Sequence, residues 1–173
     1  KPLQYISEAY KELGDEDKAL EYNQQYMDKN PNAAPTDFMK LAEIYVNKAK
    51  KDPAKKVENI DKAIAVYAKL AEKYPTLKPF AKLQEGNTAF QNELDDKAIA
   101  AYTEVINELE AKQCDEDELS YLKTSYQYMG FIYTYDKQDF NTAKPYWDKL
   151  LKLDPQNKLA NDAYEKAGLK PGE

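Results

Sequence analysis

The sequence predicts an all-α fold, an α-α superhelix of about four helix-turn-helix repeats followed by a C-terminal capping helix. The first observation is a recurring spacing: an Ala, an aromatic or polar residue four positions later, and a Pro twelve positions after the Ala. Three copies are complete and one has lost its proline: Ala19, Asn23, Pro31; Ala63, Tyr67, Pro75; Ala143, Trp147, Pro155; and Ala98, Tyr102, Glu110. The second observation is an apolar helical pattern upstream of each Ala. Together these patterns indicate helix pairs repeated along the chain.

The first repeat is predicted at about residues 2–33. Leu3, Ile6 and Tyr10 lie on one helical face, and a Gly-Asp-Glu-Asp turn at residues 14–17 leads into a second helix. Asn30-Pro31 ends that helix, because Pro cannot continue the hydrogen-bond ladder of an α-helix.

The second repeat, at about residues 35–77, contains an insertion. Ala42 precedes Ala63 by 21 residues, whereas Ser7 precedes Ala19 by 12. We expect two lengthened helices joined near Asp52-Pro53, since Asp caps a helix N-terminus and Pro is tolerated in the first turn. The inserted residues are rich in Lys, which indicates a solvated helix extension or, alternatively, a site for an anion.

The third repeat, at about residues 79–112, departs most from the pattern. Gly86 lies 12 residues before Ala98, as the spacing requires, but Leu83 and Phe90 fit a face that is one residue out of step. Two registers of its first helix therefore stay open.

The fourth repeat, at about residues 117–156, has one extra residue between Gly130 and Ala143 relative to the first repeat. A capping helix is predicted at about residues 157–168, since an array of helix pairs needs a helix with a polar outer face to cover its last repeat. We expect residues 1–173 to form a single domain.

This paired layout resembles the tetratricopeptide repeat (TPR), whose signature is W-x2-L-G-x2-Y…A-x3-F…P over about 34 residues. The resemblance implies a TPR solenoid in which the first helices of successive repeats line a concave groove that holds partners. It implies a scaffold for protein–protein interaction. Abundant Lys and Tyr without Arg is similar to TPR proteins of Bacteroides-type bacteria. Because many of these carry export signals, the resemblance favours the periplasm or cell envelope, with the cytoplasm as the alternative.

The composition argues against catalysis. The chain contains no His, which removes the commonest general base and metal ligand, and its glycines are too scattered for a phosphate-binding loop. Its one cysteine, Cys114, lies beside four acidic residues that disfavour a thiolate. We therefore predict a protein that is not an enzyme, with no catalytic residue, no metal site and no cofactor.

Charge and hydropathy narrow the range of partners. The net charge is −6 and every basic residue is Lys, which argues against nucleic acid, where Arg contacts phosphates and bases. No apolar run approaches the ~20 residues that a membrane span needs. Residues 1–86 carry 15 Lys and 14 acidic residues, whereas residues 87–173 carry 10 and 17. The C-terminal half thus has either a solvated acidic surface or a site for a cationic partner.

The predicted groove consists of residues on the first helix of each repeat that do not belong to the predicted packing face. They are Met39, Glu43, Val46 and Asn47 in the second repeat, Leu83, Asn87 and Phe90 in the third, and Tyr128, Phe131 and Tyr135 in the fourth. Aromatic side chains on such a face are plausible anchors for a partner. The alternative is that they are core residues, because a helix inside a stack can be apolar nearly all round.

We expect the partner to be a protein or peptide segment. Chaperone-tail receptors among TPR proteins hold a C-terminal carboxylate with basic side chains, but the matching positions here are Gln4, Glu8, Met39 and Glu43, so that activity is not expected. The alternative function is a structural or carbohydrate-handling component of a bacterial cell envelope. Trp147 falls at a packing position, which argues against sugar binding.

Overall fold

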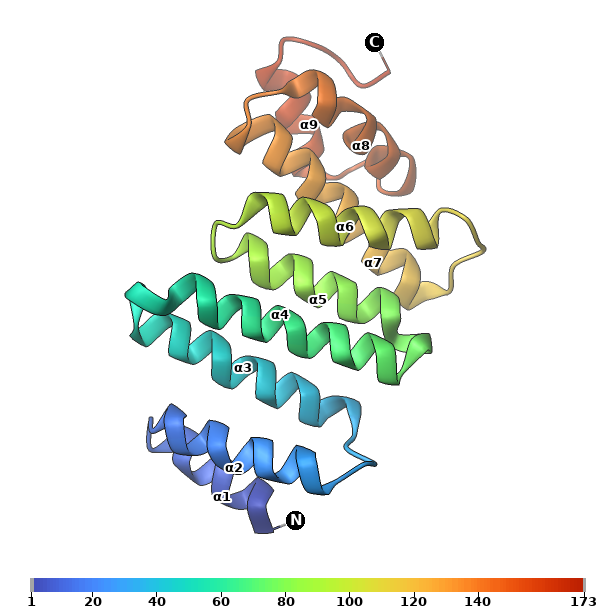
Figure 1. Cartoon of the computed structure of the whole chain (residues 1–173). Coiled ribbons are helices and arrows are strands. Elements are labelled where there is room, and N and C mark those ends of the chain that lie inside the picture. Colours follow the sequence, from blue (N-terminus) through green and yellow to red (C-terminus); the bar gives the residue numbers. More distant parts are fainter. Residues whose placement is uncertain (1, 173) are drawn as a thin grey trace. The chain divides into compact units, whose positions relative to one another are not determined.

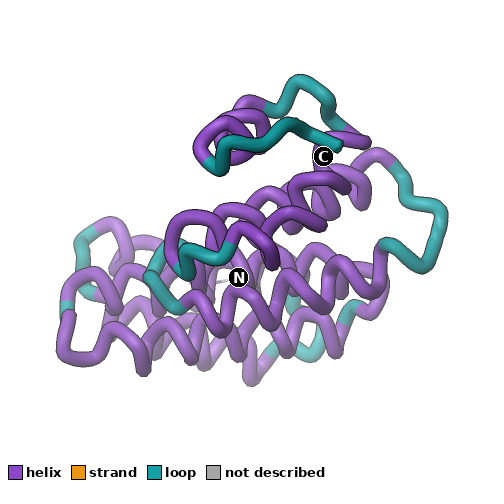
Figure 2. Tube along the Cα trace, turned by 90° about the horizontal axis from the view of Figure 1, so that it is seen from above, coloured by secondary structure: helices purple, strands orange, loops and turns teal. Residues whose placement is uncertain are grey.

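A computed structural model describes residues 2–172, which form nine α-helices joined by short turns, and no strand occurs among them (Figures 1 and 2). The chain divides into two compact units, Lys1–Leu94 and Asp95–Glu173. Unit 1 contains α1 (Pro2–Glu12), α2 (Glu16–Lys29), α3 (Pro35–Lys51), α4 (Lys56–Lys73) and α5 (Lys78–Phe90), with the short 3-10 helices η1 (Pro53–Lys55) and η2 (Pro75–Leu77). Unit 2 contains α6 (Asp95–Leu109), α7 (Glu116–Phe131), the π-helical η3 (Ile132–Asp136), α8 (Phe140–Leu153) and α9 (Lys158–Lys166). The predicted all-α helical repeat fold is confirmed.

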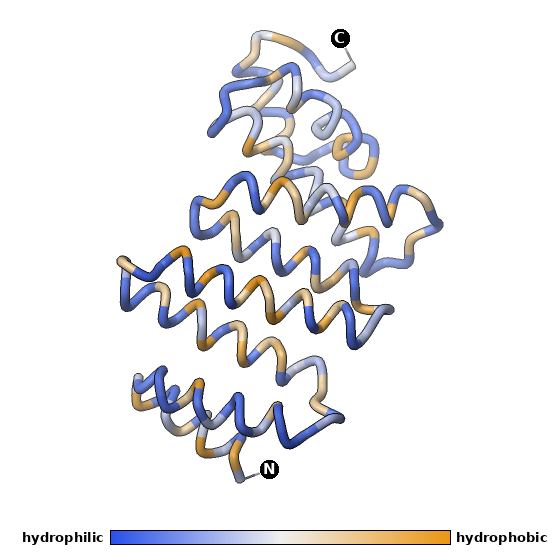
Figure 3. Tube along the Cα trace, in the orientation of Figure 1, coloured by the Kyte–Doolittle hydropathy of each residue, from blue (hydrophilic) through white to orange (hydrophobic). Residues whose placement is uncertain are grey.

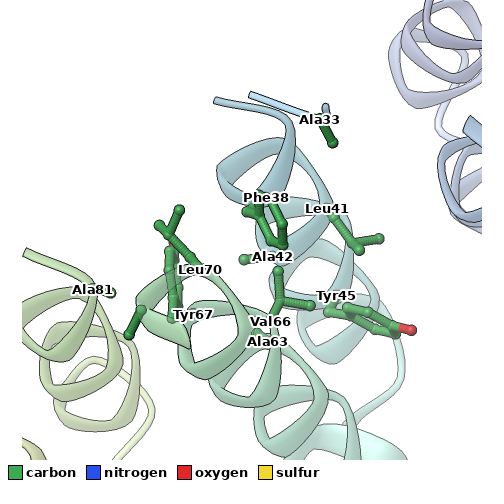
Figure 4. Close-up of a cluster of buried hydrophobic side chains, with 11 residues drawn as sticks. Ala33, Phe38, Leu41, Ala42, Tyr45, Ala63, Val66, Tyr67, Leu70 and Ala81 are labelled. Atoms are coloured by element: carbon green, nitrogen blue, oxygen red, sulfur yellow. The ribbon is translucent and has the colours of Figure 1, made fainter. Parts of the chain in front are cut away.

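The core of unit 1 lies mainly between α3 and α4 and reaches α5 (Figure 4). Apolar residues recur along the helices with hydrophilic residues between them (Figure 3), a pattern that is typical of helices with one buried face. The buried cluster consists of Ala33, Phe38, Leu41, Ala42, Tyr45, Ala63, Val66, Tyr67, Leu70, Ala71 and Ala81. Phe38 also meets the ring of Tyr74 edge-on, with ring centroids 6.4 Å apart.

The alanines of the recurring spacing are fully buried. Ala19, Ala63, Ala98 and Ala143 each have 0% of their surface exposed. Because the interior is close-packed, a larger side chain at these positions has no free volume to enter. Small residues are thus required where the paired helices approach each other.

We expect Ala63→Leu and Ala143→Leu each to lower the free energy of unfolding by about 1–3 kcal/mol through overpacking. Ala68→Leu is the matched control, because Ala68 lies on α4 but is exposed. The measurement is urea unfolding followed by circular dichroism. Equal midpoints for Ala63→Leu, Ala143→Leu and the wild type would contradict the packing role.

The insertion in the second repeat extends α3 and α4 past the turn of the first repeat. α3 has 17 residues and α4 has 18, against 11 and 14 in α1 and α2. The Asp52 carboxylate accepts a hydrogen bond from the N–H of Ala54, which starts η1 after the end of α3.

Two Lys residues of the insertion, Lys48 and Lys51, contact the turn between α1 and α2 and the first residues of α2. Lys48 Nζ lies 2.5 Å from Asp17 Oδ1, and Lys51 Nζ lies 2.6 Å from both Glu16 Oε2 and the carbonyl oxygen of Gly14. Gly14 has φ of 75°, the left-handed region that favours glycine. Lys48 and Lys51 are thus engaged by acidic side chains of the first repeat, which favours the helix extension over an anion site.

The extra residue of the fourth repeat is absorbed in a π-helical turn after α7. In η3 the N–H of Lys137 donates to the carbonyl of Ile132, five residues earlier, at 2.9 Å. A π-turn accommodates one additional residue within a helix, and such turns occur frequently at functional sites. The turn places the Thr134 hydroxyl 2.9 Å from Trp147 Nε1, which donates a hydrogen bond to it.

The position of the missing proline in the third repeat carries a polar contact within unit 2. Glu110 Oε1 accepts hydrogen bonds from the Tyr126 hydroxyl at 2.5 Å and from Lys149 Nζ at 2.6 Å. Burial would raise the pKa of Glu110, but the hydrogen bonds from Lys149 and Tyr126 outweigh it and lower that pKa. Glu110 therefore links α7 and α8 just beyond the end of α6.

Candidate functional site: a polar face of α1 and α3

The strongest candidate site in unit 1 is a polar face shared by the first helices of the first two repeats. Glu8 and Lys11 lie on one face of α1, and Lys40 and Glu43 lie on one face of α3, since residues three apart are neighbours on a helix. Two ion pairs join the helices: Lys40 contacts Glu8, and Lys11 Nζ lies 2.5 Å from Glu43 Oε2. The hydrogen bond to Glu8 raises the pKa of Lys40.

Asp37 anchors the start of this face at the N-terminus of α3. It is 4% exposed, and its carboxylate accepts hydrogen bonds from Gln4 Nε2 at 2.6 Å, the Tyr26 hydroxyl at 3.0 Å and the Ala34 N–H at 2.8 Å. The bond to Ala34 satisfies a backbone donor at the helix start. Burial, and then the hydrogen bond to Asp37, raise the pKa of Tyr26. Asp37 therefore joins α1, α2 and α3 in one polar network.

A cavity of about 110 Å³ lies beneath this face. Its walls are formed by Gln4, Ser7, Glu8, Lys11, Asn23, Asp37, Lys40, Glu43 and Ile44, which come from α1, α2 and α3. The Ser7 hydroxyl donates to the carbonyl of Ala19 at 2.7 Å, so it is already engaged. Asn23 is 4% exposed, and its Oδ1 is buried without a hydrogen-bond partner among the described residues. The cavity is polar, and its walls carry three acidic residues and two Lys.

The predicted groove residues of unit 1 occupy different environments. Glu43 lines the cavity and pairs with Lys11. Met39 is 38% exposed, and Val46 is half-buried against the α3–α4 cluster. Asn47, like Asn87 and Phe90 of α5, is half-buried.

Leu83 is the one predicted groove residue that the structure places in the core. It is 6% exposed, and Gly86, three residues later on α5, is buried as well. Gly86 marks one of the two registers that the sequence left open, and Leu83 marks the other. Both residues are buried, because α5 is buried on several faces. Leu83 contributes packing and offers no surface to a partner.

In unit 2, Phe131 and Tyr135 come together while Tyr128 is engaged elsewhere. Tyr128 stacks on Tyr102, with ring centroids 5.5 Å apart and planes 12° from parallel. The rings of Phe131 and Tyr135 lie 4.8 Å apart, and Lys166 Nζ lies 4.6 Å from the Tyr135 ring centroid. Tyr135 also lines a pocket of about 400 Å³ with Phe140 and residues of α9.

No group of three or more Cys, Asp or Glu side chains in residues 2–172 could hold a metal ion. Burial, and then the nearby Glu118, raise the pKa of the Cys114 thiol, which makes the thiolate scarce at neutral pH. Within the same residues, no helix is both long and apolar enough to span a lipid bilayer.

The sequence pattern marks only half of the six side chains of the polar face and of its start. Gln4, Glu8 and Glu43 fall at predicted groove positions, whereas Lys11, Asp37 and Lys40 do not. The one available signal was Asn23, which stands where the other three copies of the spacing have Tyr67, Tyr102 and Trp147. A polar residue at a buried aromatic position indicates either an internal hydrogen bond or a cavity.

Two segments of the chain, residues 3–33 and 38–76, match the family model described as Tetratricopeptide repeat. They correspond to the pairs α1–α2 and α3–α4, which carry the polar face and its cavity. The chain has a TPR-like helical repeat fold. No curated protein sequence matches it.

Solved structures show the same TPR-like fold. The C-terminal part of a TPR repeat-containing protein from Cytophaga hutchinsonii superposes with a TM-score of 0.67 at 21% identity, over 93% of this chain and 58% of that one. Human IFIT1, solved as a dimer with PPP-AAAA, superposes with a TM-score of 0.61 at 17% identity, over 95% of this chain and 36% of that one. The chain thus spans little more than half of the Cytophaga structure and about a third of the IFIT1 structure. At such identities the likeness shows the fold alone.

Proposed function

We propose that the chain is a non-enzymatic scaffold that binds a segment of a protein partner along the first helices of its repeats. TPR repeats generally mediate protein–protein interaction. The observation that carries the proposal is the polar face of α1 and α3. Its ion pairs lie partly exposed over an open cavity, whereas the packing of unit 1 relies on the buried apolar cluster. Such a surface is free to contact a partner without loss of the core.

The pocket beside Tyr135 supports a second contact region in unit 2. A half-buried aromatic side chain next to a pocket of about 400 Å³ resembles the anchors that dominate binding energy at protein interfaces. Of the three aromatic residues predicted for unit 2, we retain Phe131 and Tyr135, because Tyr128 stacks on Tyr102.

The proposal does not extend to nucleic acid. The chain has no Arg, and both Lys residues of the polar face are paired with acidic side chains. The ligand named for the human structure is therefore not assigned here. For the alternative, a carbohydrate-handling envelope component, Trp147 is 0% exposed, so a sugar would have to stack on tyrosine rings. A bacterial, envelope-associated origin stays part of the proposal, and the composition rich in Lys and Tyr and without Arg supports it.

Charge reversal on the polar face tests the proposal. A Glu8→Lys, Glu43→Lys variant replaces two acids of the face and breaks two partly exposed ion pairs, which costs about 0–1 kcal/mol of stability each. The matched control is Glu21→Lys, Glu72→Lys, which makes the same charge change at exposed positions of the second helices α2 and α4.

Both variants and the wild type are used to capture proteins from a lysate of the source organism, with quantification by mass spectrometry. We expect the face variant to lose specific partners by about tenfold, because it replaces both acids of the ion pairs and leaves four Lys side chains on the face, which destroys its charge complementarity to a partner. The control variant should retain them. Equal capture by all three proteins, with unchanged melting temperatures, would overturn the proposed binding face.

A further inference from the structure

The cavity beneath α1 and α3 exists because the first repeat lacks an aromatic ring. In the other three repeats the equivalent side chains, Tyr67, Tyr102 and Trp147, are 8%, 0% and 0% exposed and fill the space between their helices. Asn23 is equally buried but much smaller, so a cavity of about 110 Å³ remains beside it. A single water needs only about 10–15 Å³ of such volume, so the cavity has room for a larger polar group.

One buried acceptor of the cavity wall has no hydrogen-bond partner among the described residues. Gln4 donates to Asp37, Ser7 donates to Ala19, and the two Lys residues pair with Glu8 and Glu43. Asn23 Oδ1 receives no hydrogen bond from the described residues. A buried acceptor without a partner is unfavourable, and the Asn χ2 torsion is soft enough to turn this oxygen toward a donor. The group that completes the site must therefore donate a hydrogen bond.

The charges of the wall select among donors. Asp37, Glu8 and Glu43 outnumber Lys11 and Lys40, so the wall has a formal charge of −1. An entering carboxylate or phosphate would meet this negative charge, whereas a cation would be attracted by it. An ammonium group is purely a donor and carries the complementary charge.

We propose that this cavity accepts a lysine side chain of the bound partner segment, with Asn23 Oδ1 as the acceptor at its floor and Glu8 and Glu43 at its rim. The inference rests on the proposed scaffold function, which supplies a partner segment at the polar face. It adds the chemical class of the group that the first two repeats select.

The test uses n-butylammonium as a probe of the lysine side chain, and it needs no identified partner. The full chain is labelled with ¹⁵N and titrated at constant ionic strength, and the side-chain amide of Asn23 and the backbone amides of Ser7 and Ile44 are followed by NMR. n-Butanol and butyrate serve as the neutral and anionic probes of matched chain length. We expect saturable shifts in the order butylammonium, butanol, butyrate, with butylammonium at least about tenfold tighter than butyrate.

The variant Asn23→Phe removes the acceptor and fills the cavity with an aromatic ring, as the other repeats do. It should fold with an unchanged or higher melting temperature and lose the butylammonium shifts. Asn23→Asp is the conservative partner variant: it keeps the small size and the acceptor, and it should bind butylammonium at least as tightly as the wild type.

Absence of saturable shifts in the wild type, or shifts that persist in Asn23→Phe, would overturn the lysine site and indicate a cavity that holds water only. Butyrate binding as tight as butylammonium binding would overturn the choice of a cation. These failures differ from failure of the scaffold proposal: if capture from lysate is lost in Glu8→Lys, Glu43→Lys while butylammonium does not bind the wild type, the scaffold stands and the lysine site falls. If butylammonium binds but capture is unaffected by charge reversal, the cavity binds an ammonium group, while the scaffold proposal falls and the partner's lysine with it.

Discussion

Replacing Trp147 by Ala should lower the free energy of unfolding by about 3–5 kcal/mol, the largest effect that we expect from one substitution. Trp147 is 0% exposed and is the largest fully buried side chain among the described residues. Its removal leaves a cavity between α7 and α8 and breaks the hydrogen bond from its Nε1 to Thr134. Urea unfolding monitored by circular dichroism gives the value directly.

Two further variants separate packing from hydrogen bonding. Trp147→Phe keeps an aromatic ring in the slot but loses the N–H donor, so its cost should lie well below that of Trp147→Ala. Tyr5→Ala removes a ring that is 68% exposed and should change stability by less than about 0.5 kcal/mol. A Trp147→Ala protein that kept the wild-type midpoint and lost only binding of a partner or sugar would show that Trp147 is a ligand platform.

Gly130→Ala should also destabilise the protein, by about 1–3 kcal/mol, although Ala is normally the better helix former by about 1 kcal/mol. A Cβ atom at Gly130 would lie 2.5 Å from Cε2 of the Trp147 ring, far inside contact distance. The indole or the α7 backbone would have to shift, and both are held in a close-packed interior. The sign of the effect therefore depends on Trp147.

A double-mutant cycle makes this dependence measurable. In the Trp147→Ala background the added methyl group has space, so Gly130→Ala should become neutral or stabilising there. Non-additivity of at least about 1 kcal/mol, within the range known for residues in contact, is the expected outcome. If Gly130→Ala costs the same in both backgrounds, the close approach of α7 to Trp147 does not limit the packing of unit 2.

The helix pairs could be predicted from the sequence because the signals that define them are local. Apolar residues at helical spacing, the turn at residues 14–17 and the prolines Pro31, Pro75 and Pro155 each act within a few residues of the chain. In the structure the first two helices lie at Pro2–Glu12 and Glu16–Lys29. The small Ala position of each pair, and the large aromatic position of three of the four, can also be recognised in the sequence, because burial at a helix contact restricts the size of a side chain.

The tertiary structure alone decided how non-neighbouring side chains meet. The sequence shows one extra residue before Ala143, which a loop could have accommodated equally well. Only the structure shows the π-turn at this point, and the hydrogen bond that Thr134 in this turn accepts from Trp147. From the sequence, the Lys residues of the insertion could be solvated or could bind an anion. The contact of Lys51 with the turn at Gly14 depends on the packing of α3 beside α1 and α2, which the sequence pattern does not show. Likewise, the sequence shows that Asn23 stands where the other repeats have an aromatic residue. Its buried oxygen without a hydrogen-bond partner and the cavity beside it depend on residues from three helices. Contacts between residues more than 30 positions apart, such as Lys40 with Glu8, follow from the geometry of packed helices, and no local sequence pattern predicts them.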